Sequence, residues 1–104
     1  YNCTIISTVS SAVVTTNSKF YNCNIDCQWN NTLGHTLTLA GASNILSNNL
    51  IKVTNQNANC INATTATSMY YLNNIFLGST TPVAGNVIQA QQNNRDLYNN
   101  ILIG

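Results

Sequence analysis

Few residues of this chain carry side chains suited to acid–base chemistry. Five of its 104 residues have a formal charge, and His35 is the only imidazole. The charged residues are Lys19, Lys52, Arg95, Asp26 and Asp96. Glycoside hydrolysis uses two carboxylates about 5–9.5 Å apart, whereas the internal repeat described below separates Asp26 from Asp96 by about three coils, or about 14 Å. A serine triad around His35 lacks an acidic partner in the same repeat. We therefore predict no catalytic residue and no cofactor.

Four cysteines are the remaining reactive side chains. Cys3 and Cys23 hold equivalent positions in the repeat, so their Cα atoms would lie about 4.8 Å apart, within disulfide range, although parallel Cβ directions are unfavourable for a bridge. We expect Cys3, Cys23 and Cys60 to be buried free thiols, and a Cys3–Cys23 bridge is the alternative. The spacing of Cys23, Cys27, Cys60 and His35 matches no known zinc cluster, so we predict no metal site.

The charge balance excludes several classes of protein. A net charge of +1 offers no basic surface to nucleic acid or to an anionic membrane, and no apolar run approaches the roughly 20 residues of a membrane span. Charged residues form 5% of the chain, whereas 20 residues are Asn and 13 are Thr. A surface kept soluble by amides and hydroxyls favours an extracellular, cell-surface or virion location. Candidate glycosylation sites are Asn2, Asn30 and Asn62, each followed two residues later by Thr.

A short motif recurs five times along the chain. Its first asparagines are separated by 20, 26, 25 and 26 residues. They are Asn2, Asn22, Asn48, Asn73 and Asn99. A large apolar residue follows three positions later in every copy. This core column is Ile5, Ile25, Ile51, Phe76 and Leu102. Alternation at period two predicts a strand in each motif, and the nearly constant interval predicts that equivalent strands stack.

A second match shows that each repeat holds at least two strands. The residues around Ile61 match those around Ile88 at an interval of 27, with a looser counterpart around Leu37. No Asn-Gly, Asp-Gly or Gly-Gly pair occurs, so the strongest hairpin signal is absent. A solenoid winds onward and needs no hairpins, so we expect this architecture. The alternative is an antiparallel, pilin-like β-sandwich, in which Cys23–Cys60 would be the expected bridge.

The motif resembles the right-handed parallel β-helix repeat of the pectate-lyase-like superfamily. Asn48-Asn49-Leu50-Ile51 and Asn73-Asn74-Ile75-Phe76 look like its "N-N-x-I" form, and Asn22-Cys23-Asn24-Ile25 looks like its "N-C-x-I" form. The resemblance implies an all-β, right-handed parallel β-helix of about four coils, with a coil period of 20–26 residues and a single domain over residues 1–104. The superfamily includes lyases, hydrolases, esterases, tailspikes and adhesins, so the resemblance implies no single activity.

In such a fold, stacked asparagines would form a ladder at a turn between strands. An Asn tolerates the left-handed conformation of such a bend, and its amide can bond to the neighbouring coil. The ladder candidates are Asn49, Asn74 and Asn100, and Cys3 with Cys23 would continue the same line.

Taken together, these features favour a structural role. We expect a non-catalytic structural or adhesive β-solenoid: the shaft of an adhesin, fibre or tail spike, or a filament subunit. A repeat strand lies at each end of this sequence, so further segments of the same protein or other copies are expected to stack there. Trp29 and Tyr98 are candidates for contact with surface glycans. The alternative is a segment of a polysaccharide-degrading β-helix enzyme whose catalytic residues lie outside this chain.

Overall fold

The chain folds into short parallel β-strands. The computed structural model describes residues 1–8, 13–28, 35–53, 60–78, 88–90 and 95–103. In these residues every regular element is a strand of three to six residues, and every strand pairing is parallel. The abundance of Ile, Val and Thr suits such strands, because β-branched side chains pack well on a pleated surface.

The strands form three sheets, named here sheets A, B and C. In spatial order, sheet A contains β1 (Thr4–Ser7), β4 (Asn24–Cys27), β7 (Leu50–Val53), β10 (Ile75–Leu77) and β13 (Ile101–Ile103). Sheet B contains β11 (Ile88–Ala90), β8 (Ile61–Ala66), β5 (Leu37–Gly41) and β2 (Val13–Thr16). Sheet C contains β12 (Arg95–Tyr98), β9 (Met69–Leu72), β6 (Asn44–Ser47) and β3 (Lys19–Tyr21).

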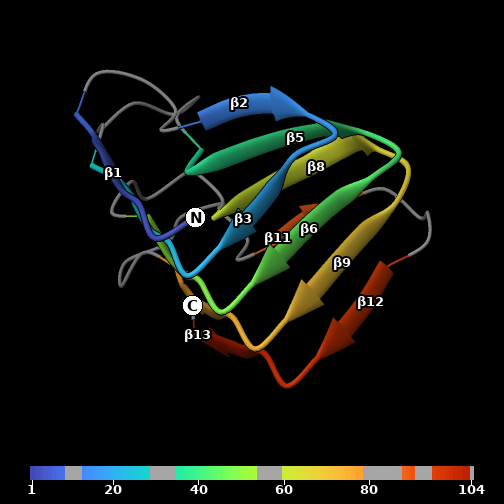
Figure 1. Cartoon of the computed structure of the whole chain (residues 1–104). Coiled ribbons are helices and arrows are strands. Elements are labelled where there is room, and N and C mark those ends of the chain that lie inside the picture. The colour runs from blue at the N-terminus through green and yellow to red at the C-terminus, as the bar shows by residue number, and fades with distance from the viewer. Residues whose placement is uncertain (9–12, 29–34, 54–59, 79–87, 91–94, 104) are drawn as a thin grey trace.

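Successive strands enter the three sheets in turn and then return to the first. Each strand therefore pairs with the strands three places before and after it in the chain, and Figure 1 shows the colour passing steadily from the blue strands at one end of the stack to the red strands at the other. This topology agrees with the predicted parallel solenoid. The antiparallel sandwich requires hairpin pairings that the described residues do not contain.

The pairing register follows the interval of the repeat. In sheet A, Ile25 lies between Ile5 and Ile51, and Phe76 lies between Ile51 and Leu102. The three central residues of this column have no exposed surface. Each fully buried side chain of this size contributes about 1.5–3 kcal/mol of hydrophobic stabilisation. Ile5 is half-buried, and Leu102, on the last strand, is 47% exposed.

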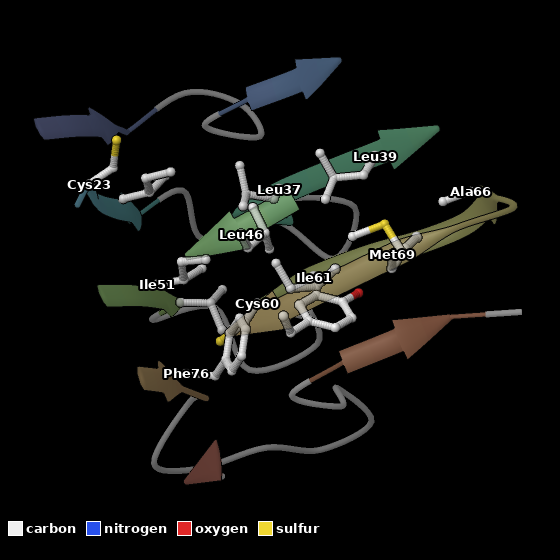
Figure 2. Packing of buried hydrophobic residues seen from close by; sticks show 14 of the residues in the cluster. Cys23, Leu37, Leu39, Leu46, Ile51, Cys60, Ile61, Ala66, Met69 and Phe76 are labelled. Atoms are coloured by element: carbon white, nitrogen blue, oxygen red, sulfur yellow. The ribbon is translucent and has the colours of Figure 1, made fainter. Parts of the chain in front are cut away.

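Sheets B and C complete the core from two further directions. Ile61 pairs with Leu37 and Ile88 across sheet B, and Leu46 pairs with Tyr71 in sheet C. Figure 2 shows side chains from all three sheets meeting in the narrow space between them. The rings of Tyr71 and Phe76 meet edge to face with centroids 5.9 Å apart, an orientation that aromatic pairs favour.

Candidate functional site

The bend into sheet A is made by the first asparagine of each motif. Asn48 and Asn73 have φ values of 56° and 53°, in the left-handed region. The same holds for the other copies, Asn2, Asn22 and Asn99. Asn tolerates this conformation better than other residues with a Cβ. The expectation that the ladder residues themselves adopt it is wrong: the left-handed residue is the one before, which frees the next asparagine to turn its amide along the stack.

The second asparagine of each motif forms a hydrogen-bonded ladder through the interior. Asn49 Nδ2 donates to Asn74 Oδ1, and Asn74 Nδ2 donates to Asn100 Oδ1, each at 3.0 Å. The same oxygens accept the backbone N–H of the preceding ladder residue, at 3.0 and 2.9 Å. Asn74 Nδ2 also donates to Leu46 O at 2.8 Å. Asn49 and Asn74 are 2% and 0% exposed, so these amides are satisfied within the protein rather than by solvent.

The first two coils have cysteine in the ladder position. Cys23 N–H donates to Asn49 Oδ1 at 2.8 Å, so the backbone pattern of the ladder continues. Its side chain instead meets that of Cys3, with the two Sγ atoms 2.8 Å apart. None of the four cysteines is in a disulfide. Cys23 and Cys60 are buried as expected, whereas Cys3 is half-buried.

Cys60 lies in an inert environment. Its Sγ donates to Leu77 O at 3.0 Å, and the residue has no exposed surface. Burial raises the pKa of the Cys60 thiol to about 12, so it is not a nucleophile near neutral pH. Within the described residues, no three His, Cys, Asp or Glu side chains are placed to hold a metal ion.

A smaller asparagine cluster at the bend from sheet B to sheet C was missed by the sequence analysis. Asn17, with φ 53°, accepts the N–H of Ala42 at 2.8 Å through its Oδ1. Asn44 accepts the N–H of Ser18 at 3.0 Å and donates to Ala40 O at 3.0 Å. The available signal was the separation of 26 residues between Ser18 and Asn44, which equals the interval from Asn22 to Asn48 in the main motif.

An ion pair between the buried Asp26 and the half-exposed Lys52 lies on the outer face of sheet A. Asp26 is 3% exposed, and its Oδ2 accepts a hydrogen bond from Gln28 Nε2 at 2.9 Å and lies 3.4 Å from Lys52 Nζ. Within the described residues, its Oδ1 has no hydrogen-bond partner. Asp96 lies on β12 of sheet C and Asp26 on β4 of sheet A, so the two carboxylates belong to different faces of the molecule.

Of the candidate glycan-contact and glycosylation residues, the structure describes Tyr98, Asn2 and Asn62. Tyr98 is 50% exposed, and its ring centroid lies 5.7 Å from that of Tyr70. Asn2 is exposed, whereas Asn62 is half-buried and accepts a hydrogen bond from its own sequon residue, Thr64 Oγ1, at 3.0 Å. Trp29 and Asn30 lie outside the described residues.

No protein-family model, curated protein or solved structure matches this chain. Within the part that the structure describes, no helix has the length and apolarity of a membrane span.

Proposed function

We propose that the chain is a non-catalytic structural unit of an extracellular, cell-surface or virion appendage. It would form a right-handed parallel β-helix of about four coils, of the pectate-lyase-like kind, as a single domain over residues 1–104. The observation that carries this proposal is the ladder of the buried Asn49 and Asn74 and the half-buried Asn100. Asn74 uses both amide hydrogens and accepts two hydrogen bonds at its oxygen, so the most polar element of the interior is committed to holding coils together.

This arrangement suits a shaft or filament. Separating two adjacent coils breaks the hydrogen bonds of three parallel strand pairs and of the ladder, and it exposes stacked apolar side chains to water. Because these contributions act together at every coil boundary, the stack resists separation along its length. The outer wall needs no particular residue for this role, which agrees with its amide- and hydroxyl-rich composition.

The two ends of the stack are proposed as contact surfaces for further segments of the same protein or for other copies. At the first coil, Tyr1 and Ile6 are 84% and 59% exposed. On β13, the apolar Ile101, Leu102 and Ile103 are 53%, 47% and 56% exposed. Parallel strand edges of this kind offer unpaired backbone groups beside apolar side chains, a combination that favours the addition of another strand.

Sedimentation velocity tests the end contacts. Leu102→Asp places a charge in the core column at the open end of the stack and is expected to reduce concentration-dependent association of the chain. Asn24→Asp makes the same change of charge at an exposed position of the outer wall and is the matched control. Association that is equal in both variants and in the unmodified chain would contradict stacking through β13.

A cleavage assay tests whether this chain itself degrades polysaccharide. The enzymatic alternative, whose catalytic residues lie outside residues 1–104, is tested by the same assay on a longer polypeptide that contains the chain. The chain is incubated with neutral and acidic polysaccharides, and new reducing ends and unsaturated products are measured. No release above a boiled sample is expected. Release that disappears in Asp26→Asn would overturn the proposal and assign the activity to the carboxylate beside Lys52.

Adhesion is tested on the aromatic pair of sheet C. Binding to immobilised surface glycans, compared between the unmodified chain and Tyr98→Ala, reports whether this pair contributes. Loss of binding on substitution is expected for an adhesive shaft, and unchanged binding would exclude Tyr98 from the contact.

A further inference from the structure

The sulfur atoms of Cys3 and Cys23 lie in direct contact at the first boundary between coils. Their Sγ atoms are 2.8 Å apart although the residues are 20 positions apart in the chain. Farther along the ladder, asparagine amides join each coil to the next. Cysteine cannot supply an equivalent pair of strong donor and acceptor groups.

The backbone on both sides of the pair fixes this approach. Asn2 N–H donates to Tyr21 O at 3.0 Å, and Asn24 N–H donates to Cys3 O at 2.9 Å. The two cysteines therefore face each other across a paired boundary, where neighbouring backbones lie about 4.8 Å apart. That separation lies within the Cα–Cα range of disulfides, about 4.4–6.8 Å. The contact between the sulfurs shows that the parallel side-chain directions do not keep them apart.

The two thiols differ in acidity. This difference matters because the rate of thiol–disulfide exchange depends on how much of the attacking thiol is present as thiolate. Burial is the largest influence on Cys23 and acts to raise its pKa, but the hydrogen bond from the Cys3 thiol and backbone hydrogen bonds outweigh it, so the pKa of Cys23 is lowered. The same hydrogen bond is the largest cause of the raised pKa of Cys3. Cys23 therefore forms the thiolate more readily than Cys3, whereas burial raises the pKa of Cys60.

We propose that Cys3 and Cys23 form a disulfide that joins the first coil to the second. The oxidant is a low-molecular-weight disulfide. The Cys23 thiolate attacks one sulfur of the oxidant and expels one thiolate; the Cys3 thiol then loses its proton to solvent, and its thiolate attacks the Cys23 sulfur and expels the second. Two cysteine thiols are oxidised, one small disulfide is reduced, and the two protons released by the cysteines end on the two small thiols.

The bond would hold the poorly buried coil at the N-terminal end of the stack. The side chains of β1 are exposed or only half-buried, and the amide ladder does not reach the boundary between β1 and β4. A disulfide restricts the unfolded chain and, here, also keeps the first coil attached when it opens locally. This inference concerns the chemistry of one boundary and does not depend on the proposed appendage role.

Peptide mapping tests the bond directly. The reduced chain is incubated with oxidised glutathione, the remaining thiols are blocked with N-ethylmaleimide in denaturant, and trypsin then cleaves after Lys19, between the two cysteines. The expected product without reductant is the peptide that ends at Lys19 linked to the peptide that begins at Phe20. Two thiols, those of Cys27 and Cys60, should carry the blocking group.

Two measurements assign the partner of Cys3. Cys23→Ala should abolish the linked peptide, whereas Cys27→Ala, a substitution on the same tryptic peptide, should retain it; fragmentation of the linked peptide from the unmodified chain locates the bond without any substitution. Hydrogen exchange of Thr4–Ser7 should slow by about tenfold on oxidation. Blocking of all four thiols, a glutathione adduct without the link, or a bond to Cys27 would overturn the proposal. Unchanged exchange in the linked chain would overturn the stabilisation of the first coil by the bond.

Discussion

Replacement of Asn74 by alanine is the sharpest test of the ladder. The side chain is completely buried and makes four hydrogen bonds: it donates to Leu46 O and to Asn100 Oδ1, and it accepts from the backbone and the side-chain amide of Asn49. Alanine removes all four and leaves their partners in a region that excludes water. The loss should therefore exceed that of an ordinary surface substitution.

The magnitude follows from the number of bonds. A hydrogen bond inside a protein contributes a net of about 1 kcal/mol, and a buried partner left unsatisfied costs about 1–3 kcal/mol. Four bonds at the lower figure predict that Asn74→Ala lowers the free energy of unfolding by about 4 kcal/mol. A domain of ordinary stability has only about 5–15 kcal/mol in total, so much of the stability of the fold depends on this residue.

Urea unfolding followed by far-UV circular dichroism measures the effect. Asn24→Ala removes an exposed asparagine from β4 and should change the free energy of unfolding by less than about 0.5 kcal/mol. Asn100→Ala, at the half-buried end of the ladder, should lie between the two and supplies the test if Asn74→Ala does not fold. If Asn74→Ala and Asn24→Ala unfold at the same urea concentration, the ladder is not a major source of stability.

Three further substitutions test local features of the fold. Asn73→Gly should leave the free energy of unfolding unchanged, whereas Asn73→Ala should lower it by about 1–2 kcal/mol, because a φ of 53° suits glycine but not alanine. Equal urea midpoints for the two variants would contradict the left-handed bend. Gly41→Ala should cost more than about 2 kcal/mol, since φ is 83° and the added Cβ would overlap Asn17 Oδ1; a wild-type thermal midpoint would refute that geometry. Burial lowers the pKa of His35 below 6.5, so the folded state resists protonation of this side chain. The free energy of unfolding should therefore fall as the pH drops through and below 6.5. Thermal scans at pH 5 and 7.5 should show this fall in the unmodified chain and not in His35→Gln.

The repeat predicts which strand residues pair in sheet A, because a large apolar residue recurs at the same structural position in each coil. Ile25, Ile51 and Phe76 are aligned by the motif interval alone, and they are partners across sheet A. The third strand of each repeat was harder to recognise, because it runs directly into the bend of the motif without a separate turn signal. The strand β3 ends at Tyr21, immediately before Asn22, and β6 ends at Ser47, immediately before Asn48.

The sequence could not show which of two adjacent asparagines makes the bend and which forms the ladder. Asn48 and Asn49 are the same residue type, and both are compatible with a bend and with a ladder. Only the backbone geometry separates them: Asn48 has the positive φ, while Asn49 is buried with its amide directed along the stack. The contact of Cys3 with Cys23 was equally open, because the strand spacing allows a bridge while the side-chain directions disfavour it.

The scarcity of charge has a physical reason in this architecture. In a parallel stack, a charge at a repeated position faces its equivalent about 4.8 Å away, and two like charges at about 4 Å repel by about 1 kcal/mol in water and about 4 kcal/mol near a protein surface. Asp26 and Lys52 are register partners in sheet A, so where two charges do meet on adjacent strands they are of opposite sign. Lys19 pairs with Ile45, and Asp96 pairs with Tyr70. Asparagine avoids the repulsion altogether, since one amide donates to the next along the stack, and this explains how a chain can repeat a polar residue through its buried interior.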